Sequence, residues 1–158
     1  MKSQSIQREQ VTSTLEVRQQ SADYKSMFAI QDLNVNTIIA NFSFGEKLQK
    51  PNRYSVQINE TEHIILSPLY LQYINHSCSP NVFFDTTTME LKTLRPIKAG
   101  EELAFFYPST EWKMTEAFNC VCGSPECLGQ IQGAAYLTYD ILKKHRFSKY
   151  ILDKYQNI

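Results

Sequence analysis

The chain has 158 residues, which is long enough to bury a sizeable core and typical of one domain. Its formal net charge at pH 7 is zero, so composition does not favour nucleic-acid binding. No apolar run reaches the roughly 18 residues that a membrane helix needs, and Met1–Gln20 lacks the apolar centre of a signal peptide. We therefore expect an intracellular protein, cytoplasmic or nuclear, with reduced thiols, no direct nucleic-acid binding and no membrane contact.

Charge is distributed unevenly along the chain. From Ser79 to Cys127 there are seven acidic and four basic residues, whereas from Ile141 onward there are five Lys or Arg residues and one Asp. Two solvated faces would explain this distribution. The alternative is an acidic groove for a basic substrate, beside a basic terminal helix.

The first half of the chain predicts a succession of short strands. Met1–Gln10 is polar and is expected to fray. The strands that follow are predicted at Thr14–Val17, Ser26–Ile30, Thr37–Phe42, Tyr54–Ile58 and His63–Leu66. A turn at Asp32–Asn36 joins the second strand to the third, and the last two strands form a hairpin across Asn59–Glu62. Gly45–Asn52 is predicted to be a polar loop.

The second half predicts more strands and then helices. Pro68 opens a bent or short helical segment. Further strands are predicted at Asn81–Asp85, Met89–Leu94 and Glu102–Phe106, the first two as a hairpin. Ala134–His145 has apolar residues at helical spacing and predicts one helix, and Ser148 is placed to cap a final helix that ends at Tyr155. Many short strands with frequent turns indicate a mostly-β domain.

Three stretches carry groups that a packed strand does not need. Asn75–Cys78 places an amide, an imidazole, a hydroxyl and a thiol in consecutive positions, and each of these needs a partner when buried. Gly-Glu-Glu-Leu-Ala-Phe-Phe-Tyr follows at Gly100–Tyr107, and a cysteine triplet follows within Cys120–Gly129. In this order, the three stretches resemble the SET domain of protein lysine methyltransferases, followed by its post-SET zinc segment.

The resemblance spans about Val11 to Gly133. It implies a mostly-β SET-domain (β-clip) fold of short strands, with a knot-like threaded C-terminal segment near Asn75, a zinc loop and a C-terminal helix. Within one compact unit, it implies a SET domain at residues 11–118, a post-SET zinc segment at 119–133 and a C-terminal helical extension at 134–158.

The cysteine spacing is typical of a metal site. Cys120, Cys122 and Cys127 supply three thiols within eight residues. Residues two apart do not readily form a disulfide, because the backbone between them is too short for unstrained geometry. Three soft ligands suit zinc, whose structural sites take four Cys or His ligands; the alternative is a group of buried or redox-labile thiols. The resemblance implies that Cys78 is the fourth ligand, which leaves His76 less favoured for that role.

The resemblance also assigns roles in a reaction. SET enzymes transfer a methyl group from S-adenosylmethionine to a lysine amine of a protein or peptide substrate, and Tyr107 matches the catalytic tyrosine. The residues expected to contact the cofactor are Asn75, His76, Tyr73, Met27, Phe28 and Leu128. Phe105 and Tyr54 are expected to line the lysine channel, and the identity of the first is expected to tune how many methyl groups are added. Core packing is expected for Phe83, Phe84, Phe106 and Phe118.

The sequence departs from the family pattern at two places. Most SET domains have Gly-x-Gly before a Val-Phe-Ala strand, whereas here Tyr24–Ser26 precedes Met-Phe-Ala. Because glycine lets the backbone approach a ligand closely, this change indicates altered cofactor contacts or lost activity. Gln72 also stands where many relatives have an arginine near the substrate channel.

Three functions are therefore in competition. The first is a lysine methyltransferase, which Tyr107, Asn75 and His76 favour. The second is a catalytically silent SET-like, zinc-stabilised protein-binding module, which Tyr24–Ser26 favours. The third is a zinc-stabilised interaction domain that docks through its basic tail, Lys143–Lys154. Titration with the cofactor separates the first function from the other two.

Overall fold

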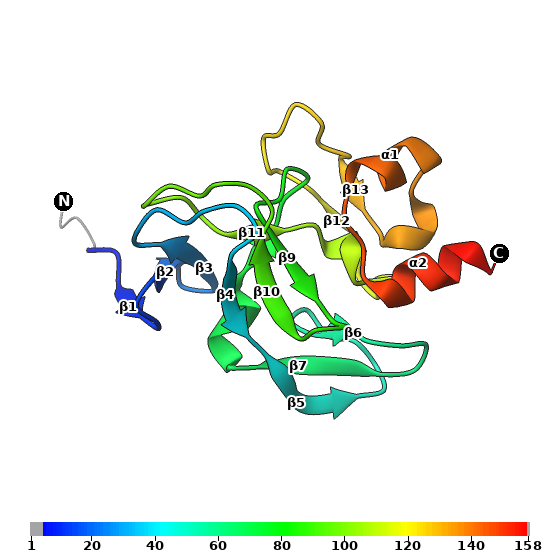
Figure 1. The fold of residues 1–158 in the computed structure, drawn as a ribbon, viewed down its shortest axis with the longest axis horizontal. Helices are drawn as coiled ribbons and strands as arrows, with labels where there is room; N and C mark the ends of the chain where they lie inside the picture. Colours follow the sequence, from blue (N-terminus) through cyan, green and yellow to red (C-terminus); the bar gives the residue numbers. More distant parts are fainter. Residues whose placement is uncertain (1–4, 158) are drawn as a thin grey trace.

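The computed structural model describes residues 5–157 and confirms a mostly-β protein of small sheets (Figure 1). Within this range, three sheets have three strands each, in the orders β1-β2-β3, β4-β10-β9 and β5-β7-β6, and two sheets are pairs, β8 with β11 and β12 with β13. The strands are β1 (Arg8–Gln10), β2 (Leu15–Ser21), β3 (Tyr24–Ala29), β4 (Ile38–Asn41), β5 (Ser43–Leu48), β6 (Val56–Gln57), β7 (His63–Ser67), β8 (Asn75–His76), β9 (Val82–Asp85), β10 (Glu90–Thr93), β11 (Ala104–Phe105), β12 (Phe118–Asn119) and β13 (Gln130–Ile131). The helical segments are three 3₁₀ turns, η1 (Leu69–Tyr73), η2 (Tyr107–Ser109) and η3 (Ala134–Tyr136), and two helices, α1 (Tyr139–Lys144) and α2 (Lys149–Gln156).

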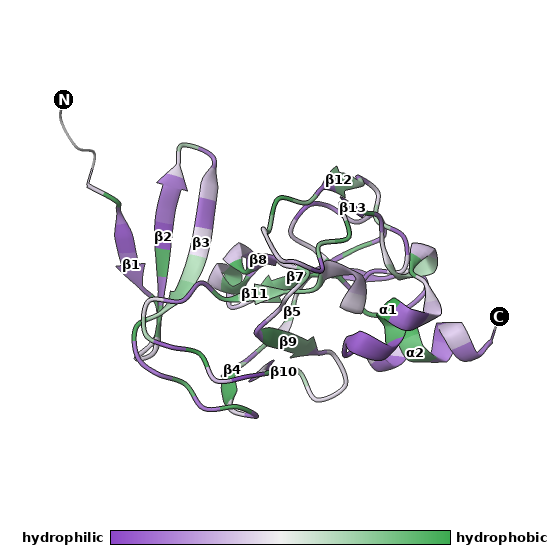
Figure 2. Ribbon diagram, turned by 90° about the horizontal axis from the view of Figure 1, so that it is seen from above, coloured by the Kyte–Doolittle hydropathy of each residue, from purple (hydrophilic) through white to green (hydrophobic). Residues whose placement is uncertain are grey.

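The sheet β1-β2-β3 and the two helices lie at opposite ends of the molecule in both views (Figures 1 and 2). Figure 2 shows that the ends of β2 and β3 nearest the molecule's centre are hydrophobic and that their far ends are hydrophilic. The burial of the side chains agrees, since Leu15 and Ala29 are fully buried whereas Ser21 and Tyr24 are exposed. The hydrophobic ends therefore anchor this sheet to the body of the protein.

The centre of the fold is the parallel pair β8 and β11, in which Asn75 lies opposite Ala104 and His76 lies opposite Phe105. The residues just before β11 run along β3, where the N–H of Leu103 donates to the carbonyl of Met27 at 2.8 Å. Segments that are far apart in the sequence thus meet at one place. The predicted threading of the C-terminal segment at this crossing stays a prediction.

Two hydrophobic cores meet at β11. Phe105 packs into the main core, whereas Phe106 packs into a second core with Ala134, Phe147 and Ile151. Successive side chains of an extended strand point to opposite sides. The same alternation puts Tyr107, at the start of η2, on the side of Phe105, where it packs against the main core.

The predicted hairpins are confirmed. β6 pairs with β7, and β9 pairs with β10, both antiparallel. The strands predicted on either side of Asp32–Asn36 are also present as β3 and β4, but they pair with β2 and β10 and not with each other. The turn between them carries the chain from one sheet to another.

Two predictions of local structure were wrong. The stretch Gly45–Asn52, predicted to be a loop, begins inside β5, an edge strand whose side chains are almost all exposed. An edge strand of this kind need not show the apolar alternation that marks a half-buried strand. Met1–Gln10 was predicted to fray, yet β1 pairs with β2; residues 1–4 and 158 lie outside the described part.

The predicted single helix over Ala134–His145 was also wrong. It is divided into η3 and α1 by Leu137 and Thr138, which are extended, with ψ of 146° and 159°. Gly133, just before η3, has φ of 114°, and a Cβ there would lie 2.6 Å from the carbonyl oxygen of Trp112. The predicted cap at Ser148 is confirmed, since its side chain accepts from the N–H of Ile151.

None of the helices between residues 5 and 157 is long and apolar enough to cross a membrane.

Candidate functional site

A cavity of about 1010 Å³ lies against the parallel pair β8 and β11. Seven of the residues predicted to form the site line this cavity: Tyr54, Asn75, His76, Phe105, Tyr107, Cys120 and Cys122. They lie just before β6, in β8 and β11, at the start of η2 and in the cysteine loop. Folding thus brings together side chains that lie up to 68 positions apart, from Tyr54 to Cys122.

The phenol of Tyr107 is held among aromatic rings. Its ring centroid lies 4.7 Å from that of Phe105, 5.2 Å from that of His76 and 5.9 Å from that of Phe118. Burial raises the pKa of Tyr107 well above its usual range. The hydroxyl therefore stays protonated at neutral pH and offers one donor and two acceptor lone pairs.

Asn75 ties β8 to β3. Its Nδ2 donates to the backbone oxygen of Lys25 at 2.9 Å and to Oγ of Ser26 at 3.2 Å. These two residues belong to the stretch that replaces Gly-x-Gly, and Ser26 is fully buried. Within the described residues, no hydrogen bond reaches Oδ1 of Asn75, which leaves one acceptor at the cavity wall.

His76 connects Tyr107 to the cysteines. Its Nδ1 accepts from the backbone N–H of Tyr107 at 3.1 Å, so in the neutral ring Nε2 carries the proton. Nε2 lies 3.4 Å from Sγ of Cys78. Burial, with a smaller effect of the charge of His145, lowers the pKa of His76 to about 4. The imidazole is therefore neutral near physiological pH and acts as a donor to sulfur.

Asn81 is a site residue that the sequence did not single out. Its Nδ2 donates to the carbonyl of Glu102 at 2.8 Å, and its Oδ1 accepts from the N–H of Ala104 at 2.9 Å. Its backbone N–H also donates to the carbonyl of Ala104 at 3.0 Å. One buried side chain thus fixes the approach to β11, and with it the place of Tyr107. The only local signal was its position at the end of the polar stretch, after Pro80.

The four cysteines lie together. The sulfur atoms of Cys78, Cys120, Cys122 and Cys127 are all within 4.8 Å of one another, and none forms a disulfide. Sγ of Cys78 lies 3.9 Å from Sγ of Cys120, close to the separation of about 3.8 Å that follows from a tetrahedron with Zn–S bonds of about 2.3 Å. Backbone N–H groups of Cys122 and Leu128 point at two of these sulfurs, both at 3.4 Å. The donor set therefore fits a structural zinc ion.

Several predicted site residues lie beside the cavity and outside its lining. Met27 is fully buried in the main core, and Phe28 bridges to Glu102. Tyr73 packs edge-on against Tyr54, with 6.4 Å between the ring centroids. Leu128 packs against the second core. The cofactor contacts expected of Met27, Phe28, Tyr73 and Leu128 remain predictions.

Phe118 shows a role that the sequence did not predict. We expected core packing, but it is half-buried and lines the cavity, where it contacts the rings of His76 and Tyr107. Phe83, Phe84 and Phe106 are buried, in agreement with core packing. Tyr24, in the stretch that replaces Gly-x-Gly, is 39% exposed and also lines the cavity.

His76 contacts both Tyr107 and Cys78, so Tyr107 and the cysteine cluster lie close together at β8. A profile of the SET domain matches residues 3–108. The chain belongs to the SET-domain family. The match ends just after Tyr107, so the assignment of the cysteines to a post-SET segment rests on their cluster in the structure.

Two of the similar proteins are named as methyltransferases. Methyltransferase flvH of Aspergillus flavus is 46% identical over 85 residues, which cover 52% of this chain and 48% of that protein. The H3 lysine-36 specific histone-lysine N-methyltransferase of Gibberella zeae is 33% identical over 88 residues, covering 51% of this chain and 9% of that protein. The chain thus spans about half the length of the first relative and far less of the second.

Among solved structures, the SET fold of this chain resembles the crystal structure of KRYPTONITE in complex with mCHH DNA, H3(1-15) peptide and SAH. The TM-score is 0.58 at 18% identity, and the match covers 77% of this chain and 30% of that one. At this identity the similarity shows the fold. It agrees with the mostly-β SET architecture predicted from the sequence.

Proposed function

We propose that the protein is an S-adenosylmethionine-dependent methyltransferase that acts on the side-chain amine of lysine in a protein or peptide. The observation that carries the proposal is the half-buried phenol of Tyr107 in one cavity with Asn75, His76 and the cysteine loop. The named relatives support this reaction class. We also propose an intracellular location, cytoplasmic or nuclear; the relative named a histone-lysine methyltransferase favours the nucleus.

The residues around Tyr107 suit methyl transfer to an amine. A free lysine has a pKa of about 10.4, and only the neutral amine has a lone pair to attack with. The apolar walls formed by Phe105 and Phe118 disfavour the charged ammonium form. The oxygen of the protonated Tyr107 hydroxyl would accept a hydrogen bond from an N–H of the amine, which leaves the lone pair free and holds the amine in near-attack geometry.

The cavity also fits the cofactor. When bound, S-adenosylmethionine supplies a methyl group on a positively charged sulfur. Asn75 would bind it through its free Oδ1, and His76 would border it from β8. A volume of about 1010 Å³ is at the upper end of ligand pockets, which run to about 1,000 Å³, so cofactor and lysine have room together.

A zinc ion held by Cys78, Cys120, Cys122 and Cys127 would have a structural role. Four thiolates leave no open position for a water or a substrate. The ion would join the loop after Phe118 to β8 and so complete one wall of the cavity. Burial raises the pKa of the Cys78 thiol, so a bound cation is what would keep this sulfur ionised.

One observation favours the second candidate, a silent SET-like protein-binding module. Tyr24 borders the cavity within the stretch where most relatives have glycine, and its bulk narrows the room for a cofactor. Its partial exposure leaves the ring able to turn aside, which is why we place the enzyme first.

Calorimetric titration with S-adenosylmethionine separates the two candidates. We expect saturable binding with one site per chain, followed by methylation of a lysine peptide. A histone H3 peptide that contains lysine 36 is the first substrate to test, because the relative from Gibberella zeae is named as specific for H3 lysine-36. Mass spectrometry of a methylated cell lysate then maps other targets. A folded, zinc-loaded protein that binds no cofactor would leave the silent module as the function.

A further inference from the structure

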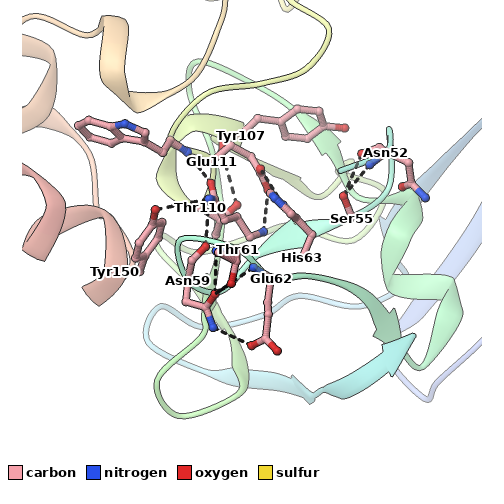
Figure 3. A network of polar contacts seen from close by, with 12 residues as sticks. Asn52, Ser55, Asn59, Thr61, Glu62, His63, Tyr107, Thr110, Glu111 and Tyr150 are labelled. Carbon is pink, nitrogen blue, oxygen red and sulfur yellow. Dashed lines mark hydrogen bonds and ion pairs between the residues drawn. The ribbon is translucent and has the colours of Figure 1, made fainter. Parts of the chain in front are cut away.

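A polar network that includes Glu111, Thr110 and Tyr150 lies beside Tyr107 (Figure 3). Its centre is a reciprocal pair of hydrogen bonds between β6 and the segment that follows η2. The backbone N–H of Gln57 donates to Oε1 of Glu111 at 2.9 Å, and the backbone N–H of Trp112 donates to Oε1 of Gln57 at 2.9 Å. Gln57 is 6% exposed and Glu111 is 8% exposed. We call these two bonds the Gln57–Glu111 bridge.

The bridge reaches Tyr107 through the backbone. The N–H groups of Thr110 and Glu111 both donate to the carbonyl of Tyr107, each at 3.2 Å. The residue that supplies the carboxylate of the bridge is therefore also bonded to the residue that supplies the phenol. A shift of Glu111 would displace the start of η2.

On its other side, the bridge reaches the opposite wall of the cavity. Gln57 directly follows Tyr54, Ser55 and Val56, and all three of these residues line the cavity. Val56 is 2% exposed. Gln57 also lies opposite His63 in the β6–β7 pairing, which leaves it little freedom to move along the strand. The bridge thus spans from the Tyr54 wall to the Tyr107 turn.

Helix α2 covers the network. Nε2 of Gln57 donates to Oη of Tyr150 at 3.4 Å, and the Tyr150 hydroxyl donates to Oε2 of Glu60 at 2.9 Å. Both bridge residues are almost fully buried, although Glu111 also borders the cavity. Bonds shielded from water hold their geometry, because a buried donor that loses its partner is not compensated by solvent.

We propose that Gln57 and Glu111 are positioning residues that set the distance between Tyr107 and the Tyr54 wall of the lysine channel. The proposal rests on the proposed function. The bridge does not touch the reacting atoms; it acts through the two walls that it joins. The two bonds of the bridge do not involve Asn75, where we propose that the cofactor binds.

The test compares two variants at one position. Glu111→Gln keeps an oxygen that can accept from Gln57, whereas Glu111→Ala removes the acceptor. In single-turnover methyl transfer, we expect Glu111→Ala to slow the rate by about 10- to 100-fold, the scale of a small misplacement of reacting groups. Cofactor affinity and the KM for peptide should change little. Glu111→Gln should restore most of the rate.

The control is Lys154→Gln, which removes a contact to Glu60 at the exposed edge of the same network and leaves the bridge intact. We expect the wild-type rate. A wild-type rate in folded Glu111→Ala would overturn the proposal. So would a Glu111→Gln variant as slow as Glu111→Ala, because the charge and not the bridge would then matter.

A second variant keeps the proposal testable if Glu111→Ala does not fold, and a second measurement keeps it testable if the protein has no methyltransferase activity. If Glu111→Ala does not fold, Gln57→Met takes its place, since it removes the acceptor for Trp112 at similar volume. Hydrogen exchange of the wild-type amides needs no activity at all. We expect the amides of Gln57 and Trp112 to exchange far more slowly than that of Thr61 in the adjacent turn. Equal rates would overturn the bridge, whereas a protected bridge in a protein that transfers no methyl group would overturn the function alone.

Discussion

The backbone N–H of Tyr107 donates to Nδ1 of His76, whose other ring nitrogen faces Sγ of Cys78. One imidazole therefore joins the proposed catalytic turn to the proposed zinc site. Partners of this kind orient metal ligands and are part of a metal site's design. A change at the cysteines should therefore alter the position of Tyr107, although the cysteines and Tyr107 belong to different segments of the chain.

Removal of the metal tests this connection. We expect one zinc per chain, and we expect Cys122→Ser to lower the melting temperature and methyl transfer together, because binding energy at such a site is folding energy. Zinc content, melting temperature and rate are measured on the same sample. Pro125→Ala, in the same loop and exposed, is the control and should change none of them. A zinc-free wild type whose four thiols all react at once in the native state would contradict this account.

Asn75 should decide cofactor binding. S-adenosylmethionine is expected to raise the melting temperature of the wild type, since a ligand that binds only the folded state stabilises it. Asn75→Ala should abolish the rise, because it removes both the free acceptor and the bonds to Lys25 and Ser26. Asn41→Ala, at an exposed position of β4, should keep the rise. An undiminished rise in Asn75→Ala would place the cofactor elsewhere.

Glu111 should make stability depend on pH. Burial raises its pKa to about 7 from 4.5, so the folded state holds a proton that the unfolded state has already lost. The stability from this group is complete below the unfolded value and is lost as pH rises through about 7. Two groups face it: His63, whose Nδ1 lies 3.9 Å from Oε2 of Glu111, and Tyr150. Burial lowers the pKa of His63, so its ring is neutral at neutral pH and does not favour the ionised form of Glu111.

The measurement is urea unfolding of wild type and Glu111→Gln at about pH 5.5 and about pH 8. The amide mimics the protonated carboxyl, so the variant should gain in unfolding free energy relative to wild type as pH rises. A difference that is constant across this range would show that Glu111 does not titrate there. Comparing variants cancels the pH dependence of the cysteines, which both proteins share.

Phe105 should set the product. Its ring lies against Tyr107 and carries no hydroxyl that could hold a water beside the amine. A methylated amine needs that space to turn, so the wild type should reach di- or trimethyl-lysine in excess cofactor. Phe105→Tyr adds a hydrogen bond of roughly 0.5–1.5 kcal/mol, enough to slow later transfers by up to about tenfold. A time course of product masses on one peptide should show a stop at monomethyl-lysine; an unchanged product pattern would remove Phe105 from the channel.

The sequence predicted those parts of the site that local patterns encode. The cysteine spacing indicated a metal cluster, and the structure brings Cys78 to the other three. The two strands predicted at Asn81–Asp85 and Met89–Leu94 form the hairpin of β9 and β10. Both features depend on the residue types and spacings within short stretches.

Other parts depend on partners far apart in the sequence. Asn81 acts through bonds to residues 21 and 23 positions away, and Gln57 through residues 54 and 55 positions away. Neither set of contacts produces a periodic pattern or a sequence motif from which it could be predicted. The role of Phe118 could not be predicted for the same reason. An aromatic residue near a cysteine loop can equally well pack in a core, and only the fold of the loop brings Phe118 against Tyr107.

The central claim is that the Tyr107 hydroxyl carries methyl transfer to lysine. Its most direct test is the single-turnover rate of Tyr107→Phe on a lysine peptide, read by intact mass, beside calorimetry with the cofactor. Tyr136→Phe, at a residue that is 57% exposed and outside the cavity lining, is the control. The account predicts unchanged cofactor binding and a fall in rate of about 100-fold or more, as for loss of one oriented donor in a dry site. A Tyr107→Phe variant that transfers methyl groups as fast as the wild type would contradict it.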